Sequence, residues 1–425
     1  MAEDLHSIRI DEEKCTGCVL CMKACPTKAI RLRKNKAVIT GERCVDCGEC
    51  YRVCPQNAVI PLTTSFSDLK HYKCTVALPS ATLYTQFGWE VMPNQILLAL
   101  HKIGFDHVYD GALMCEMVSA GIEEHLKVKP EIKPRISTYC PAVIRLITSL
   151  YPNLTNHLLP VEAPRELAAK RLRREISRER NIAPDDIGII HITACPARMI
   201  SIQRPIGLSK SYLDGAISVR DIYGRLLDAI KDIQEDVILH QSSGVGLGWA
   251  ISGGLINGIS MDNCLAVSGV NDVIEILDDV ESGKLRDIEY LECLICPDGC
   301  VGGPLNVENR HFAKTRAKSL VKMFGERTRV SRKMISRLHH EGFFTMEKKI
   351  EATPFPPLDE DPVRAIEMRN RMEEIIPQLG GRQCGACGAP DCRTLARDIV
   401  LNQAKMDDCV FVHIARHERG VRSCC

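Results

Sequence analysis

Eight cysteines near the N-terminus repeat the spacing Cys-x2-Cys-x2-Cys-x3-Cys-Pro in two tandem runs. Three closely spaced thiolates hold three corners of a [4Fe–4S] cube, and in two-cluster proteins the fourth cysteine of each run reaches the other cluster. Zinc sites instead use cysteine pairs that a longer gap separates, so zinc does not fit this pattern. The spacing therefore predicts one cluster on Cys15, Cys18, Cys21 and Cys54, and another on Cys44, Cys47, Cys50 and Cys25.

A second set of four cysteines lies near the C-terminus: Cys384, Cys387, Cys392 and Cys409. Four thiolates can close one tetrahedral zinc site or one cube, and the spacing alone leaves both open. Glycines between these cysteines allow the backbone to approach a bulky cluster closely. The segment also resembles the small [4Fe–4S] domain of several anaerobic redox proteins, and this resemblance favours the cube.

Between these two sets, three more cysteines stand directly before proline: Cys140, Cys195 and Cys296. Proline suits the first position of a helix, so each thiol is expected at a helix start, where free amides and the helix dipole favour an anion. Cys300 follows Cys296 by four residues, which places both on one face if the segment is helical. Together the four suggest another cube, although any one of them alone could be a small buried hydrophobe.

The segments around these four cysteines resemble the three signatures of the [FeFe]-hydrogenase active-site domain. The segments are residues 137–141, 193–198 and 292–303. The glycine-rich stretch 246–254 resembles the segment that precedes the third signature in that family. The resemblance spans nearly residues 1–325, in the family's order, and its motifs together are highly specific.

The resemblance implies two ferredoxin-type clusters that feed an α/β domain carrying an H-cluster. An H-cluster is a [4Fe–4S] cube that shares one thiolate with a di-iron unit bearing carbonyl, cyanide and dithiolate ligands. Carried over by motif, the cube would be held by Cys140, Cys195, Cys296 and Cys300, and Cys300 would bridge to the di-iron unit. With the C-terminal set, four [4Fe–4S] clusters are expected. The implied activity is the reversible conversion of dihydrogen to protons and electrons, with the cofactor supplying the bond chemistry.

The chain departs from the highly active members of the family around the implied di-iron unit. Tyr139 stands where they have a cysteine that relays protons, and a phenol is bulkier and has a reference pKa of about 10 against about 8.5 for a thiol. Because a relay group should titrate near the working pH, slow proton transfer is expected. Arg198 replaces a lysine that pairs with a cyanide, which keeps the charge but changes the geometry. Thr193 and Leu294 replace methionines, and the glycine run of the third signature is shortened.

These departures and the extra C-terminal cluster resemble the divergent family members thought to sense dihydrogen. The first hypothesis is therefore a slow, sensory hydrogenase, which would need a redox or signalling partner protein and di-iron maturation proteins. A second hypothesis is a hydrogenase-like iron–sulfur protein without the di-iron unit, acting in electron transfer or cluster assembly. A third is an ordinary catalytic hydrogenase with ferredoxin as its partner, against which Tyr139 argues.

Other residues that could do chemistry carry weaker signals. The glycines at 244, 246 and 248 lack the spacing of a dinucleotide site. Glu116, Glu123 and Glu124 lie where the family has glutamates of the proton path. We expect these three residues to be exposed charges on a helix instead. Five scattered histidines are expected in the core or on the surface: His71, His101, His107, His191 and His240. Six cysteines remain after the sixteen predicted ligands: Cys74, Cys115, Cys264 and Cys293, expected to be packing residues, and Cys424 and Cys425, expected in a frayed terminus.

The body between the cysteine sets alternates strand-like and helical patterns, which predicts an α/β fold with parallel sheets and crossover helices. Strands are expected at 76–78, 187–192 and 236–240, and helices at 164–181 and 218–233. Short strand-like runs at 29–32 and 58–60 follow the two N-terminal cysteine runs, as expected of a ferredoxin-like α+β domain. The predicted domains are 1–65 with two clusters, 66–350 with the H-cluster, a Pro-rich linker at 351–365, and a small iron–sulfur domain at 366–425.

Composition limits the partners and the compartment. The 425 residues include 55 Lys and Arg against 54 Asp and Glu, so the net charge of +1 gives no electrostatic reason to expect nucleic acid or a membrane surface. No apolar run reaches the ~18 residues of a membrane span. The start is acidic and polar, unlike a secretory signal. With 22 cysteines, the chain is expected to be a cytoplasmic metal or redox protein. The resemblance to [FeFe]-hydrogenases further implies anaerobic metabolism.

Overall fold

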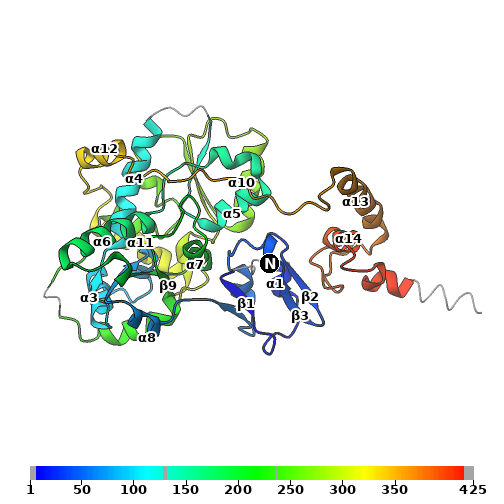
Figure 1. The fold of residues 1–425 in the computed structure, drawn as a ribbon, viewed down its shortest axis with the longest axis horizontal. Coiled ribbons are helices and arrows are strands. Elements are labelled where there is room, and N and C mark those ends of the chain that lie inside the picture. Colours follow the sequence, from blue (N-terminus) through cyan, green and yellow to red (C-terminus); the bar gives the residue numbers. More distant parts are fainter. Residues whose placement is uncertain (1–5, 128–131, 235–236, 416–425) are drawn as a thin grey trace, which may run out of the picture. The chain divides into compact units, whose positions relative to one another are not determined.

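The structure is a computed structural model that describes residues 6–127, 132–234 and 237–415. The chain forms two compact units (Figure 1). The first unit joins the two ends of the sequence, residues 1–44, 48–61 and 354–425. The second contains residues 45–47 and 62–353. The N-terminal cysteines other than Cys47 and the C-terminal cysteines, which the sequence places in separate domains, thus belong to one unit.

The first unit contains two antiparallel strand pairs and short helices. β1 (Ile8–Ile10) pairs with β4 (Val59–Pro61), and β2 (Ile30–Arg33) pairs with β3 (Lys36–Ile39). Each N-terminal cysteine run contains one short helix, α1 (Leu20–Ala24) or α2 (Glu49–Val53). β2 and β4 correspond to the strand-like runs predicted after the two cysteine runs, which agrees with a ferredoxin-like α+β domain.

The C-terminal part of this unit contains α13 (Pro362–Ile375) and α14 (Cys392–Val400). α13 begins inside the stretch predicted to be a linker. Its start has a clear local cause, because the Asp361 side chain accepts a hydrogen bond from the Val363 amide and Pro362 occupies the first helical turn. The end of the predicted linker is therefore helical.

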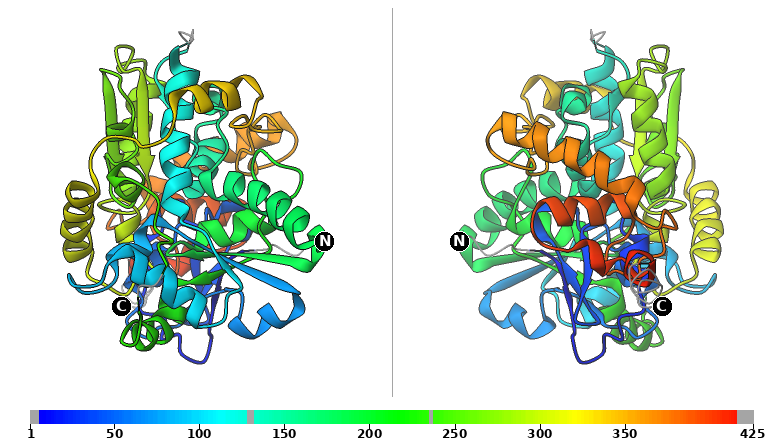
Figure 2. Two further views of the ribbon diagram at one scale, coloured as in Figure 1. Left: turned by 90° about the vertical axis from the view of Figure 1, so that its left-hand side faces the viewer. Right: turned by 90° about the vertical axis from the view of Figure 1, so that its right-hand side faces the viewer.

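The second unit is built on two parallel sheets, which confirms the α/β prediction (Figure 2). One sheet has the order β6-β5-β8-β9, and the other has the order β10-β11-β7. β5 and β8 are buried at every residue, as parallel strands covered on both faces are. The strands are β5 (Cys74–Pro79), β6 (His107–Val108), β7 (Arg135–Ile136), β8 (Ile187–Thr193), β9 (Gly215–Ser218), β10 (Cys264–Ser268) and β11 (Tyr290–Leu294).

Helices connect and cover these strands (Figures 1 and 2). The two predicted helices are present, and Ser218 caps the second by accepting a hydrogen bond from the Asp221 amide. The helices of this unit are α3 (Pro93–Lys102), α4 (Gly111–Lys127), α5 (Pro141–Leu150), α6 (Pro164–Arg180), α7 (Pro196–Gln203), α8 (Val219–Ile230), α9 (Gly244–Gly248), α10 (Val270–Glu281), α11 (Arg310–Phe324) and α12 (Arg332–His340).

The strand predicted at 236–240 is wrong for residues 237–240, which form no strand, and Asp236 lies outside the described residues. The Asn94 side chain takes the place of a neighbouring strand there. Its amide donates to the Val237 carbonyl at 3.0 Å and accepts from the amides of Leu239 at 2.8 Å and His240 at 3.2 Å. One side chain thus satisfies backbone groups that a ladder would otherwise pair.

The glycine-rich run forms the short helix α9, which packs closely against α4 and α11. A Cβ atom at Gly246 would collide with the carbonyl oxygen of Ala112, and one at Gly244 would collide with that of Val321. These glycines therefore serve helix packing, in agreement with the rejection of a dinucleotide site.

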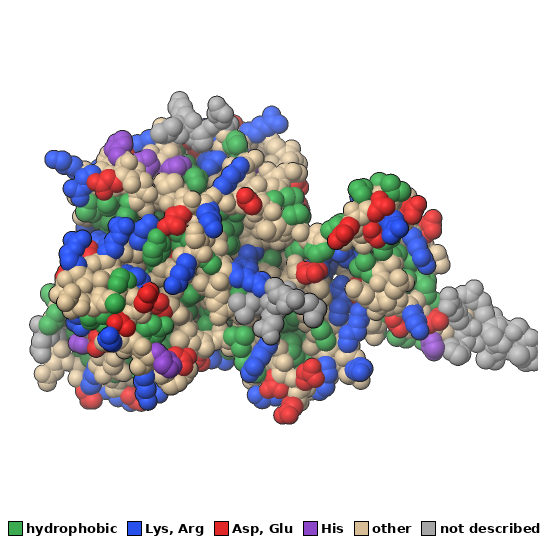
Figure 3. All heavy atoms as spheres, in the orientation of Figure 1, with side chains coloured by type: hydrophobic (Ala, Val, Ile, Leu, Met, Phe, Trp, Pro, Cys, Tyr) green, Lys and Arg blue, Asp and Glu red, His purple; other side chains and the backbone are tan. Residues whose placement is uncertain are grey.

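Among the described residues, no helix is long and apolar enough to cross a membrane. Basic and acidic side chains alternate over the face drawn in Figure 3. This mixed surface agrees with the net charge of +1.

The close packing of α9 predicts the effect of one methyl group. Gly246→Ala should lower the free energy of unfolding by about 1–3 kcal/mol, because the backbone of α4 must move to admit the Cβ. Gly224→Ala is the matched control, since nothing lies within 4 Å of its Cβ position in α8, and it should stabilise by about 0.5–1 kcal/mol. Thermal and urea unfolding measure both changes, and equal effects of the two would contradict this account.

A buried carboxyl in β11 predicts a pH dependence of stability. Glu292 accepts hydrogen bonds from the Gly253 and Ile256 amides, and burial raises its pKa to about 7. Between pH 4.5 and 7 the unfolded chain ionises at this position while the folded chain does not, so stability is lost as the pH rises through this range. Between pH 5 and 8, the free energy of unfolding of the wild type should fall by up to about 3 kcal/mol more than that of Glu292→Gln. Parallel losses in both proteins, measured by urea unfolding, would show that Glu292 does not cause them.

Candidate functional site

The first predicted cluster set gathers around one cavity in the first unit. Its walls include Cys15, Cys18, Cys21 and Cys54, the last from the second cysteine run. Burial, together with the neighbouring Cys15, Cys18 and Cys54, raises the pKa of Cys21 to about 11. Backbone amides of Ala37 and Ala58 donate to the sulfurs of Cys15 at 3.4 Å and Cys54 at 3.3 Å. Four thiols with amide donors around a cavity are what a cube requires.

The second set shows the same crossing of the two runs. Burial raises the pKa of Cys50, and among its neighbours Cys25 of the first run raises it most. The Cys25 sulfur in turn accepts the Ala29 amide at 3.2 Å. The fourth cysteine of the first run therefore lies with the second run, as the crossed spacing predicts.

The C-terminal cysteines also come together. Burial raises the pKa of Cys387, and the nearby Cys384 and Cys409 raise it further. Cys392 is the first residue of α14. Gly385 and Gly388 both have φ of +81°, a conformation that favours glycine, so the loop can turn around its thiols.

In the second unit, two of the three Cys-Pro pairs start a helix as predicted. Cys140 is the N-cap of α5 and Cys195 is the N-cap of α7. The third pair does not, because Asp298 and Gly299 have φ of +63° and +97° and turn the chain away from a helix. Cys296 and Cys300 are thus separated by a turn, so the helix start predicted at Cys296 is wrong and the two do not share a helical face.

The thiols of Cys140, Cys195 and Cys300 nevertheless converge, because their segments follow parallel strands. β7, β8 and β11 lead into the three signature segments at their carboxyl ends, where α/β proteins build their sites. Burial, together with the neighbouring Cys195 and Cys300, raises the pKa of Cys140 to about 11. Burial also raises the pKa of Cys195, and Cys300 adds to that effect.

Arg198 and Tyr139 surround the sulfur of Cys300. Arg198 Nη2 donates to Cys300 Sγ at 3.2 Å, and Tyr139 Oη lies 3.9 Å from the same sulfur. The guanidinium carbon of Arg198 lies 4.7 Å from the centre of the Tyr139 ring. Burial lowers the pKa of Arg198, but Tyr139 and the nearby thiols outweigh burial and raise it well above its usual value. Arg198 is therefore a permanent buried cation beside the sulfurs.

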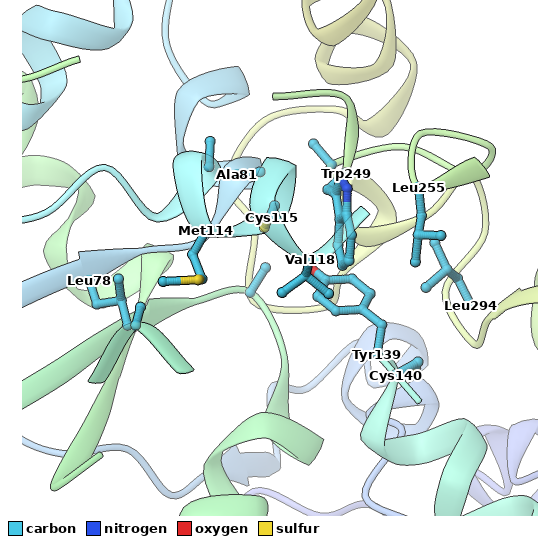
Figure 4. Packing of buried hydrophobic residues seen from close by; sticks show 14 of the residues in the cluster. Leu78, Ala81, Met114, Cys115, Val118, Tyr139, Cys140, Trp249, Leu255 and Leu294 are labelled. Carbon is cyan, nitrogen blue, oxygen red and sulfur yellow. The ribbon is translucent and has the colours of Figure 1, made fainter. Parts of the chain in front are cut away.

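Tyr139 is held tightly in this site (Figure 4). Its ring packs edge to face against Trp249, with the ring centres 4.7 Å apart, and Trp249 Nε1 donates to Ser119 at 2.8 Å. Burial raises the pKa of the Tyr139 phenol well above its usual value, although Arg198 acts in the opposite direction. The phenol therefore keeps its proton at neutral pH.

A cavity adjoins this arrangement and is lined by Ser80, Cys115, Tyr139, Arg165, His191 and Arg198, among others. Several polar atoms there have no hydrogen-bond partner among the described residues: Ser80 Oγ, His191 Nε2, and Nε and Nη1 of Arg165. Of these, Ser80 and Arg165 offer donors, whereas His191 Nε2 is an acceptor because Nδ1 of the neutral ring donates to the Leu78 carbonyl at 2.8 Å. Buried donors such as those of Ser80 and Arg165 normally have partners, so they indicate a bound group that accepts hydrogen bonds. A di-iron unit with cyanide ligands fits this requirement, since its cyanides are hydrogen-bond acceptors.

Ser80 and Arg165 are cavity residues that the sequence motifs do not predict. Ser80 directly follows β5, so its position at the carboxyl end of a parallel strand was the available signal. His191 is buried as expected, but it also lines the cavity, and burial lowers its pKa well below its usual value. Cys115 is a packing residue in the core, as predicted, and it is also part of the cavity wall.

Other expectations have mixed outcomes. Glu116 is fully buried, and it accepts hydrogen bonds from the Ser243 amide at 2.8 Å and the Thr328 hydroxyl at 2.8 Å. The prediction of an exposed charge is wrong there, because this carboxylate joins three segments of the chain. Cys74 and Cys293 are buried, Cys264 is partly buried, and Cys424 and Cys425 lie outside the described residues.

Comparison with known proteins identifies the family. The model of the "Iron only hydrogenase large subunit, C-terminal domain" matches residues 73–304, more than half of the chain. The chain belongs to this iron-only hydrogenase family. A 4Fe-4S dicluster domain matches residues 7–55, and a domain described as a putative Fe-S cluster matches residues 379–411.

Individual hydrogenases are distant from this family member in sequence. The periplasmic [Fe] hydrogenase large subunit of Nitratidesulfovibrio vulgaris is 24% identical over 365 residues, which cover 71% of this chain and 86% of that protein. A variant [FeFe]-hydrogenase from Chlamydomonas reinhardtii has a TM-score of 0.53 at 13% identity, covering 68% of this chain and 98% of that one. An apo form of the same algal enzyme has a TM-score of 0.52 at 14% identity, covering 68% and 97%. The fold is shared with both structures.

The crossed thiols predict which substitutions remove the same cluster. Cys25→Ser should abolish the same electron paramagnetic resonance (EPR) signal as Cys50→Ser, with a loss of about four iron atoms per chain in each case. Cys54→Ser should instead abolish the signal that depends on Cys21. Iron analysis and EPR of the reduced proteins measure this. If Cys25→Ser removed the same signal as Cys21→Ser, each run would hold its own cluster and the crossing would be wrong.

Proposed function

We propose that this hydrogenase family member binds dihydrogen at an H-cluster and interconverts it slowly with protons and electrons, in a sensory or regulatory role. The main support is Arg198, a buried cation that donates to Cys300 and also lines the cavity of unpaired donors. One side chain thereby links the thiolate that would bridge the two halves of an H-cluster to the space that would hold the di-iron unit.

The proposed ligands follow the three groups of thiols. One ferredoxin-type cube would bind Cys15, Cys18, Cys21 and Cys54. The other would bind Cys44, Cys47, Cys50 and Cys25. The cube of the H-cluster would bind Cys140, Cys195, Cys296 and Cys300. A fourth cube would bind Cys384, Cys387, Cys392 and Cys409. The di-iron unit would carry carbonyl, cyanide and dithiolate ligands, and when bound it supplies the site at which dihydrogen is split.

The residues of this chain would position that unit and exclude water. Ser80, Arg165 and Arg198 present hydrogen-bond donors to its acceptor ligands, and donors of fixed direction in a buried site are worth far more than in water. Trp249 is almost fully buried and packs against the Tyr139 ring, which lines the cavity (Figure 4). An arginine presents its donors in a planar fork, so it fixes orientation more strictly than a lysine.

Proton movement is the step that this site would slow. The Tyr139 phenol lies within 3.9 Å of Cys300 Sγ, but burial holds its proton and the contact with Trp249 restricts its ring. A group whose pKa lies far from the working pH is a poor relay. Slow turnover suits a protein that reports the presence of dihydrogen through its clusters more than one that consumes it.

The same role defines the proposed partners. A redox or signalling protein would receive the electrons, and maturation proteins would deliver the di-iron unit. The sixteen cysteines proposed as cluster ligands must bind as thiolates, which supports a reducing compartment such as the cytoplasm of an anaerobe. The Nitratidesulfovibrio relative is periplasmic by its name, so compartments differ within the family under this proposal.

One observation favours the alternative, an iron–sulfur protein without a di-iron unit that acts in electron transfer or cluster assembly. Tyr139 and Arg198 both lie against Cys300, and either is bulkier than the family residue that it replaces. Infrared spectra of the anaerobic protein, recorded after exposure to the di-iron maturation proteins, distinguish the two. Carbonyl and cyanide bands that shift under dihydrogen support the H-cluster, and their absence at full [4Fe–4S] loading would refute it.

Substitution of the phenol tests the proposed cause of slow turnover. Tyr139→Cys should increase dihydrogen oxidation at least tenfold, because a positioned relay typically contributes about 10²–10⁴-fold. Tyr139→Phe is the matched control, as it keeps the ring against Trp249 and removes only the hydroxyl. The hydrogenase assay at several pH values measures both variants, and an unchanged rate in Tyr139→Cys would show that proton relay does not limit turnover.

A further inference from the structure

Within the first unit, the C-terminal segment packs directly on the ferredoxin-like segment. The Leu32 amide in β2 donates to the Gly388 carbonyl at 2.8 Å. Lys23 Nζ donates to the Pro390 carbonyl at 2.6 Å and also to the Gln383 carbonyl. Backbone groups on both sides take part, so the contact has a defined register.

A buried ion pair lies at the centre of this contact. Arg31 Nε and Nη2 donate to the two carboxylate oxygens of Asp398 at 2.7 and 3.1 Å, and Arg33 donates to the same carboxylate at 3.1 Å. The side chains of Arg31 and Asp398 are only 9% and 2% exposed. A buried bidentate ion pair is stable only when its hydrogen bonds are well aligned. This pair therefore requires one fixed orientation of the two segments.

The contact involves the loops that hold the predicted cluster ligands. Gly385 and Gly388 lie between Cys384 and Cys392 in the sequence. A Cβ at Gly385 would lie 2.9 Å from Met22, the residue after Cys21, and a Cβ at Gly388 would collide with the Leu32 carbonyl. Leu32 also lines the cavity of Cys15, Cys18, Cys21 and Cys54. The C-terminal thiol loop therefore abuts the walls of the first ferredoxin-type site.

The charges at this contact suit two anionic clusters. A cube held by four thiolates carries net negative charge, and two such groups repel each other at close range. The ferredoxin side contributes Lys23, Lys28, Arg31 and Arg33, of which Lys28 pairs with Asp391 at 2.5 Å. This excess of cations reduces the repulsion and allows the two clusters to lie close together.

We propose that the C-terminal cluster is the outer relay of the electron chain and exchanges electrons with the cluster on Cys15, Cys18, Cys21 and Cys54. The Cys384 side is exposed, which gives a partner protein access to the outer cluster. This inference rests on the proposed function for the source of the electrons.

The electron transfer needs only dihydrogen as the electron donor and the partner protein as the acceptor. Oxidation of one dihydrogen molecule releases two protons and two electrons, and the electrons leave one at a time. In each transfer the ferredoxin-type cluster is oxidised by one electron and the C-terminal cluster is reduced by one electron. No bond is formed or broken between the two clusters, and the partner protein is the final one-electron acceptor.

EPR of the full-length protein tests the contact independently of the di-iron unit. The protein is loaded with [4Fe–4S] clusters only, then fully reduced. Magnetic coupling should broaden the signal of the C-terminal cluster and speed its relaxation, as revealed by subtracting the spectrum of Cys387→Ser/Cys392→Ser. A C-terminal signal that is simple and uncoupled in wild type would overturn the proposal.

Variants of the contact show whether the observed coupling depends on it. Lys23→Ala/Lys28→Ala removes exposed cations without disturbing the buried pair, and Arg31→Gln removes that pair. In both variants the half-saturation power of the C-terminal signal should fall severalfold while the iron content stays at the wild-type level. Glu373→Gln is the control, because it breaks an exposed pair with Arg393 inside the C-terminal segment and should leave the coupling unchanged. Wild-type coupling in both contact variants would refute this docking.

This test and the infrared test can fail separately. Coupling without carbonyl and cyanide bands would refute the H-cluster and leave the docked clusters intact. In the matured protein, dihydrogen should reduce the C-terminal cluster in wild type faster than in the contact variants. Equal rates would refute the electron route, even where the infrared bands show that dihydrogen is bound.

Discussion

The burial of one cation, Arg198, sets the arrangement of the second unit. Removing a guanidinium from water costs several kcal/mol unless anionic partners surround it. Here the compensation comes from sulfur, because Arg198 donates to Cys300 and lies near the thiols of Cys195 and Cys140. Those thiols sit where they do because helices α5 and α7 begin at the prolines that follow them. When these sulfurs hold a cluster they would be thiolates, so the cation and the filled site would stabilise each other's charge, and loss of either would leave an uncompensated buried group.

Features that depend on local sequence could be predicted, whereas features that depend on contacts between distant segments could not. Cysteine spacing is local, so the crossed sets in the first unit and the helix starts at Cys140 and Cys195 were predictable. The turn after Cys296 was not, because it depends on left-handed backbone at Asp298 and Gly299 that no spacing rule reveals. Ser80 and Arg165 come from distant segments, and only the folded sheet brings them to the cavity. Asn94 similarly replaces a strand at 237–240 through side-chain bonds that span more than 140 residues.

The division of the chain was unpredictable for a related reason. Composition marks the stretch after residue 350 as a linker, and a linker suggests an independent domain. The Arg31–Asp398 pair instead joins residues 367 positions apart. Charged residues mostly lie on the surface, so the sequence around Arg31 and Asp398 gives no sign that both are buried. Only their shared burial shows that the two ends of the chain form one unit with two kinds of cysteine site.

Burial of the thiols also determines how the clusters can be inserted. Metal binds the thiolate, whereas burial raises the pKa of Cys21 and Cys140 to about 11, so both are protonated in the empty protein at neutral pH. Cluster insertion must then release these protons, which makes it more favourable as the pH rises. Once iron is bound, its positive charge replaces the protons, and the amides that donate to Cys15, Cys25 and Cys54 can stabilise sulfur that carries negative charge. The same low-dielectric surroundings that oppose the free thiolates therefore strengthen the interactions of the filled sites.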